Sequence, residues 1–118
     1  MTPFGKRIRE LRRDRGITQA EMARDLNISA AYLSALEHGR RGRPSWFLVQ
    51  NIITYFNIIW DDAEELQDLA RLSHPRLTVN TSGLSPIATE FVNRLADGIA
   101  DLPDDKVAAM MSLLDDQG

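Results

Sequence analysis

Cysteine is absent from the 118-residue chain. Disulfide bonds and thiolate metal ligands, including those of zinc fingers, are therefore excluded, and the fold must be stabilised by buried apolar side chains. No apolar run approaches the roughly 18 residues of a membrane span, and no apolar segment follows the basic N-terminal residues as in a secretory signal. These absences predict a cytoplasmic protein with one main core.

Residues that could support catalysis are few. The two histidines, His38 and His74, lie far apart in the sequence, with no nucleophile motif, metal-ligand spacing or glycine-rich phosphate loop near them. Acidic residues cluster between positions 61 and 68, but they lie at the expected start of a helix, where negative charge is favourable. We therefore expect no catalytic residue, no metal and no cofactor, and the protein is not expected to be an enzyme.

Charge is distributed unevenly along the chain, whose net charge is −3. Residues 1–46 carry ten basic and five acidic side chains, whereas residues 47–118 carry four basic and twelve acidic ones. The first part is therefore suited to contact with a polyanion, which would repel the second part. The alternative, that the basic faces are simply solvated, stays open on charge alone.

Apolar periodicity and capping residues predict two helices before residue 27. Phe4, Ile8 and Leu11 recur at helical spacing, and a glycine at position 16 ends that helix. Thr18 and Glu21 form a capping box that starts the second helix, whose inward side chains are Met22, Ala23 and Leu26.

A tight turn and a third helix follow. Asn27 is expected to take the left-handed conformation of such a turn, which asparagine tolerates well, and Ile28 fills the core beneath it. Ser29 caps a third helix of about residues 30–38, with Leu33 and Leu36 facing inward.

Two more helices are predicted between residues 45 and 73. Ser45 caps the fourth, and Asp61 with Glu64 forms a capping box for the fifth. Apolar residues at helical spacing give the fourth helix a buried stripe of Val49, Ile52, Ile53 and Phe56. The aromatic residues of this region are interpreted as core or helix-packing residues rather than a base-stacking platform: Trp46, Phe47 and Trp60.

The remainder is predicted to be a linker and a helical hairpin. Residues 77–81 alternate with period two, as in a short strand or an extended linker. Ser85 and Pro86 then start a sixth helix and Pro103 a seventh. The predicted fold is all-α, with a five-helix bundle over residues 1–73, a linker or short strand over 74–85 and a helical segment over 86–118.

Residues 17–43, ITQAEMARDLNISAAYLSALEHGRRGR, resemble the Cro-like, lambdoid-repressor family of helix-turn-helix domains, also called the XRE family. The resemblance extends over about residues 4–60. It includes Thr18-Gln19, Ile28-Ser29, Tyr32-Leu33-Ser34 and the closing Leu36-Glu37-x-Gly39, while Asn27 replaces the glycine usual in the family. The resemblance implies a lambda-repressor-like bundle that binds double-stranded DNA.

The third helix is expected to read DNA, because the N-terminal end of such a helix meets base edges in the major groove. Its outward residues are predicted to be Ser29, Ala30, Ala31, Ser34 and Ala35, with Tyr32 at the edge. This face has no Arg, Asn or Gln, whereas related repressors commonly carry glutamine or arginine at the three alanine positions. We therefore expect thymine-rich half-sites, read through methyl contacts and DNA shape.

Phosphate contacts are expected on both sides of the reading helix. Thr18 and Gln19 lie at the start of the second helix, where an amide side chain and free N–H groups can bind a phosphate. Arg40, Arg41 and Arg43 follow the reading helix, in a loop that runs along the DNA backbone in the family. The alternative for this loop is a solvated charge cluster.

The C-terminal segment is predicted to be a homodimer interface, since paired helix-turn-helix domains usually read half-sites about 34 Å apart. An isolated hairpin would expose an apolar stripe consisting of Ile87, Phe91, Leu95, Ile99, Leu102, Val107, Met110 and Leu114. The alternative is that the hairpin folds back on its own bundle.

The function predicted is that of a transcriptional regulator, with a repressor that binds a palindromic operator as the leading hypothesis. A second hypothesis is an antitoxin that represses its own operon and binds a toxin through the C-terminal segment. A third, of a different class, is a protein–protein adaptor that has lost DNA binding, which the alanine-rich reading face leaves open.

Overall fold

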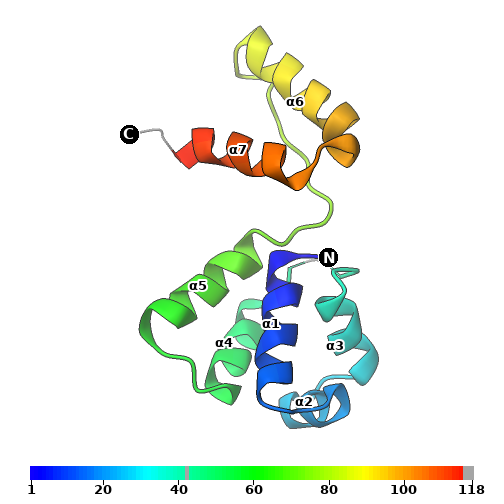
Figure 1. The fold of residues 1–118 in the computed structure, drawn as a ribbon, viewed down its shortest axis with the longest axis vertical. Coiled ribbons are helices and arrows are strands. Elements are labelled where there is room, and N and C mark those ends of the chain that lie inside the picture. Colours follow the sequence, from blue (N-terminus) through cyan, green and yellow to red (C-terminus); the bar gives the residue numbers. More distant parts are fainter. Residues whose placement is uncertain (42, 116–118) are drawn as a thin grey trace. The chain divides into compact units, whose positions relative to one another are not determined.

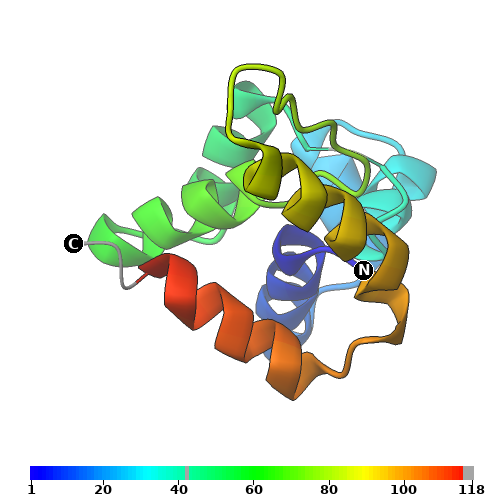
Figure 2. The ribbon, with the colours of Figure 1, turned by 90° about the horizontal axis from the view of Figure 1, so that it is seen from above.

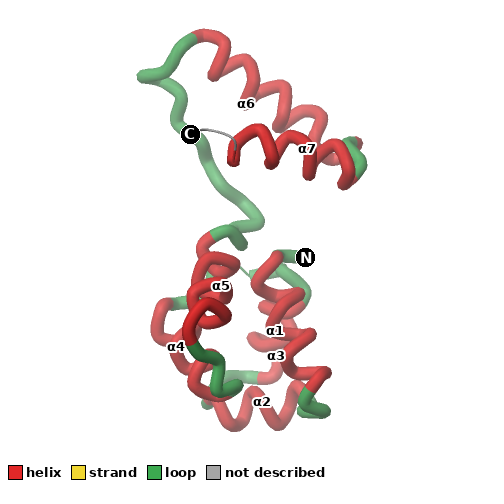
Figure 3. Tube along the Cα trace, turned by 60° about the vertical axis from the view of Figure 1, so that its left-hand side comes forward, coloured by secondary structure: helices red, strands yellow, loops and turns green. Residues whose placement is uncertain are grey.

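The computed structural model describes residues 1–41 and 43–115, and within these residues it contains helices and no strand (Figures 1 and 3). The chain divides into two compact units, residues 1–77 and residues 78–118. No helix of the described part is long and apolar enough to cross a membrane.

The first unit consists of α1 (Pro3–Asp14), α2 (Gln19–Leu26), α3 (Ala30–Glu37), α4 (Trp46–Tyr55) and α5 (Trp60–Arg71). The second consists of α6 (Pro86–Gly98), the short 3-10 helix η1 (Ile99–Asp101) and α7 (Asp104–Asp115). The predicted all-α fold is confirmed.

Capping side chains start most of the helices where the sequence predicts. The hydroxyl oxygens of Thr18, Ser29 and Ser45 accept hydrogen bonds of 3.0–3.1 Å from the backbone N–H three residues later. Ser85 does the same for α6 at 3.4 Å. Asn27 has a φ of 59°, which confirms the left-handed turn between α2 and α3.

All five helices of the first unit, α1 to α5, contribute buried side chains to its core. Phe4, Ile8, Leu33, Ile52 and Phe56 are all fully buried there. α1 packs against α3 and α5, while α2 packs against α3 and α4. The predicted inward faces of these helices are therefore confirmed.

The predicted capping box at Asp61 and Glu64 is wrong. α5 begins at Trp60, directly after Ile59, and no side chain caps it. Trp60 has a φ of 55°, so the chain enters the helix through a left-handed residue. Asp61 consequently lies inside the first turn of α5, where its negative charge is favourable. A capping side chain must come from the residue before the first turn, so Asp61 does not cap the free N–H groups of this helix.

The interpretation of the three aromatic residues as core or helix-packing residues is also wrong. Trp46, Phe47 and Trp60 are 67%, 75% and 84% exposed. The buried face of α4 is formed by Leu48, Val49 and Ile52, which turns the two aromatic residues of its first turn toward solvent. Trp46 and Phe47 contact each other edge to face, with ring centroids 5.3 Å apart.

The linker alternative holds for residues 77–81, because the described part of the chain contains no strand there. A strand needs a partner with which to exchange backbone hydrogen bonds. The Asn80 side chain instead accepts a 3.0 Å hydrogen bond from the Ser82 N–H, which forms a local turn.

The second unit is an open helical hairpin. α6 and α7 diverge from η1 (Figure 2), and α7 begins at Asp104, one residue after the predicted start. No described residue between positions 78 and 115 is buried. The described part of this unit therefore has no hydrophobic core of its own.

Candidate DNA interface

α2, the turn at Asn27 and α3 form a compact helix-turn-helix. The N–H of Asn27 donates to the Arg24 carbonyl at 3.1 Å, and the N–H of Ile28 donates to the Ala23 carbonyl at 3.0 Å. These bonds satisfy the last carbonyls of α2 and place Ile28 partly within the core. α3 therefore starts in a defined direction immediately after α2.

One face of α3 is buried in the core, so the rest of the helix surface is left free for other contacts. Leu33 and Glu37 are 0% exposed and Leu36 is 2% exposed. The six residues predicted to face DNA are Ser29, which caps α3, and five residues of the helix that lie outside this buried face, although Tyr32 also packs against the core. Ser29, Ala30 and Ala31 are exposed, and Tyr32, Ser34 and Ala35 are partly exposed. The structure thus brings the predicted reading residues together at the N-terminal end of α3 and along its next turn.

A buried ion pair, not predicted from the sequence, attaches α3 to α1. Arg12 Nε donates to Glu37 Oε2 at 2.7 Å, and Arg12 Nη2 donates to Glu37 Oε1 at 2.9 Å. Arg12 also donates to the Ile17 carbonyl at 3.0 Å, and Gln19 Nε2 donates to Glu37 Oε1 at 3.1 Å. The position of the reading helix is therefore tied to α1 and to the start of α2.

The charge on Glu37 is stabilised by its partners. Burial by itself raises the pKa of the Glu37 carboxyl, but the hydrogen bonds from Arg12 and Gln19 and the positive charges of Arg12 and Arg9 outweigh it. The pKa of Glu37 consequently lies below its ordinary value, while its hydrogen bond raises the pKa of Arg12. Glu37 lies four residues after Leu33, so its place on the core face of α3 is the signal that could have revealed it.

The predicted phosphate-binding residues at the start of α2 also have internal roles. The Gln19 amide nitrogen bonds to Glu37, and the Thr18 hydroxyl accepts the N–H of Glu21 at 3.1 Å. Thr18 is exposed and Gln19 is partly exposed. Their contact with phosphate stays a prediction, which rests mainly on the backbone N–H groups of the first turn.

The basic loop begins directly after α3. Gly39 has a φ of 70°, and a side chain there would come within 2.7–2.8 Å of the backbone of Met1 and Thr2. The N–H of Arg40 donates to the Ala35 carbonyl at 2.9 Å, which closes the end of α3. The arginines at positions 40, 41 and 43 are all exposed, and they follow α3 in the sequence.

A family model described as a helix-turn-helix domain matches residues 3–66. The chain is also 34% identical over 62 residues to RghRB of Bacillus subtilis (strain 168), an uncharacterized HTH-type transcriptional regulator. That match covers 52% of this chain and 45% of the relative, so the chain spans less than half of the relative's length. No solved structure matches the chain significantly.

The family match extends over more than half of the chain and contains the whole of α2, α3 and the basic loop. The chain therefore belongs to the helix-turn-helix domain family.

Proposed function

We propose that the chain is a transcriptional repressor of the Cro-like, lambdoid-repressor (XRE) type, which acts in the cytoplasm and binds a palindromic operator as a homodimer. The observation that carries this proposal is the arrangement of α3. Its core face is fully buried, its N-terminal face is free, and three exposed arginines follow it. This is the arrangement that a helix needs to lie in the major groove with its backbone contacts alongside.

Base recognition is assigned to the free face of α3. The exposed methyl groups of Ala30 and Ala31 can contact the C5-methyl of thymine, and the Ser34 hydroxyl can bond to several bases. Short side chains also let the helix approach the base edges closely. We infer thymine-rich half-sites, whose shape contributes to recognition at base pairs that the protein does not touch.

Dimerisation is assigned to α6 and α7. Ile87, Phe91 and Ile99 are at least half exposed, and no described residue of this unit is buried. The other residues of the predicted stripe are exposed or partly exposed: Leu95, Leu102, Val107, Met110 and Leu114. A cavity of about 220 Å³ between the two helices is lined by Phe91, Leu95, Leu102 and Met110 among others. A second copy of the hairpin would cover this apolar surface.

Selection of binding sites from a random DNA library tests the proposal. The wild-type protein is compared with a variant in which Arg40, Arg41 and Arg43 are replaced by alanine. A matched control replaces Lys6, Arg7 and Arg76, which removes the same charge elsewhere in the first unit. We expect a twofold-symmetric motif for the wild type and the control, weakened or lost in the loop variant. The absence of any enriched motif would instead favour the adaptor function.

An antitoxin is the second candidate, because the exposed apolar side chains of α6 and α7 could also bind a different protein. In that case the same helix-turn-helix represses an operon that includes a toxin gene. Relief of toxicity on co-expression with a neighbouring gene product would favour the antitoxin over a repressor that acts alone.

A further inference from the structure

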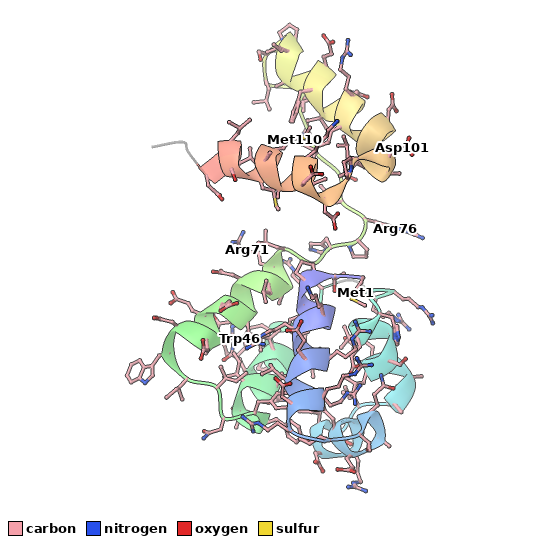
Figure 4. All side chains as sticks on the ribbon, viewed as in Figure 1. Met1, Trp46, Arg71, Arg76, Asp101 and Met110 are labelled. Atoms are coloured by element: carbon pink, nitrogen blue, oxygen red, sulfur yellow. The ribbon has the colours of Figure 1, made fainter. Side chains whose placement is uncertain are left out.

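An open hollow of about 390 Å³ lies between the start of α4 and the end of α5. Its floor is apolar and includes Val49 and Ala70, while its rim includes Arg43, Trp46 and Arg71. Trp46 and Arg71 are labelled in Figure 4. Arg43 also belongs to the basic loop, so the hollow and the loop that we assign to the DNA backbone share this residue.

The rim of the hollow is positively charged. No acidic side chain is among the described residues that line it. Arg71 forms an ion pair with Asp68 at 3.7 Å, but both side chains are more than 60% exposed, so the pair is weak and can yield to a stronger partner. Ser45 and Trp46 are the first residues of the α4 N-terminus, and the helix dipole adds positive potential to the rim.

Trp46 lines the hollow with an exposed aromatic side chain. Trp46 is 67% exposed, although Leu48 and Val49 of the same helix are core residues. An exposed tryptophan offers a flat apolar surface and an N–H donor, a combination that is common where proteins meet partners. A guanidinium pair beside such a ring suits a phosphate attached to an apolar group, as in the deoxyribose-phosphate backbone.

We propose that a backbone phosphate of the operator binds in this hollow between Arg43 and Arg71, with Trp46 packed against the adjoining sugar. This proposal rests on the proposed DNA-binding function and extends the interface from the basic loop to the C-terminal end of α5. The contact reads no base, so it adds affinity and register but not sequence preference.

The substitution R71A tests the contact on the selected operator. We expect a loss of affinity of roughly five- to tenfold, with an unchanged selected sequence and a salt dependence reduced by about one phosphate equivalent. The matched control is R7A, because Arg7 forms the same kind of i,i+3 ion pair with Glu10 at 3.5 Å but does not line the hollow. Equal affinity and salt dependence of R71A and R7A would overturn the proposal.

A scan of neutral methylphosphonate groups along the operator separates a direct contact from an indirect effect. The wild type should lose affinity when one particular phosphate is neutralised, and R71A should lose nothing further at that position. Additive losses at every phosphate would overturn the proposal. If the wild type binds no DNA at all, the proposed function itself fails, which is a different result.

Trp46 provides a second readout in a W60F background, which leaves it as the single tryptophan. Binding of the operator should shield its fluorescence from acrylamide, and R71A should reduce this protection at equal occupancy. Unchanged quenching in the saturated complex would show that the hollow stays open to solvent, and would overturn the proposal.

Discussion

Glu37 combines full burial with a full negative charge, and the charge is matched by Arg12. The substitution E37Q would remove the charge and leave the Arg12 guanidinium, whose side chain is only 12% exposed, without its counterion. We expect a loss of about 2–4 kcal/mol in the free energy of unfolding, because breaking a buried pair leaves an uncompensated charge. Urea unfolding followed by circular dichroism measures it. The control E10Q disrupts the exposed Arg7–Glu10 pair and should lower the free energy of unfolding by less than about 1 kcal/mol. An equal loss for E37Q and E10Q would contradict a stabilising role of the buried pair.

The same residue predicts how stability depends on pH. The pKa of Glu37 is lower in the folded than in the unfolded protein, so the ionised carboxylate stabilises the fold above the ordinary glutamate pKa of about 4.3. This contribution is lost as the pH falls through the lower, folded pKa. Unfolding free energies of the wild type should therefore fall more steeply in acid than those of E37Q. Parallel pH curves would show that Glu37 is not the group responsible.

The backbone conformation and the partners of a single residue were predictable from the sequence at some positions and not at others. Asn27 could be predicted to be left-handed because a tight turn between two helices leaves few alternatives. The left-handed Trp60 could not, since a bulky residue seldom takes this conformation. The Glu37–Arg12 pair joins residues 25 positions apart, so local spacing alone does not reveal it.

At the level of elements, α3 is the helix on which the proposed function depends. The substitution A31E places a negative charge on its exposed second residue, where it faces the DNA in our proposal. The free energy of unfolding should not fall, since an acidic residue near a helix N-terminus is favourable. The affinity for the operator should fall roughly tenfold or more, because the DNA phosphates repel the added carboxylate. Anisotropy titrations measure the affinity. N51E adds the same charge on an exposed position of α4 and should bind normally; an equal loss in both would point to net charge alone.

Helix positions were predictable where a capping side chain coincides with apolar periodicity, as at Ser29, Ser45 and Ser85. α5 departs from this rule because Asp61 and Glu64 carry a capping pattern but the helix starts before them. The exposed aromatic residues of α4 show a related effect. Trp46 and Phe47 are apolar by type, yet the stripe that α4 buries is set by Leu48, Val49 and Ile52.

For the whole molecule, the second unit raises the question of what covers its apolar side chains. If it is a second copy, sedimentation should show dimers of the wild type at micromolar concentration. F91D should give monomers, because a charge would enter the interface, and should weaken operator binding. N93D places the same charge on an exposed position of the same helix and should remain dimeric. A monomeric wild type would contradict the dimer.

The division into a bundle over residues 1–73 and a helical segment over 86–118 is a prediction from the punctuation between residues 74 and 85, where Pro75 and Gly83 interrupt the helical pattern. The exposed apolar faces of the two described helices of the second unit were predictable, because two short helices cannot bury both of their apolar faces by themselves. The hollow beside Trp46 was not predictable. It depends on how the start of α4 meets the end of α5, and these segments are separated by more than twenty residues in the sequence.

The most direct test of the central claim, that α3 lies in the major groove, is photocrosslinking to the selected operator with a photoreactive base at a half-site thymine. We expect the crosslink to map to the tryptic peptide of residues 25–40, which contains all of α3. Crosslinks confined to peptides of α6 or α7, in a complex that is otherwise specific, would contradict the assignment of α3 as the reading helix.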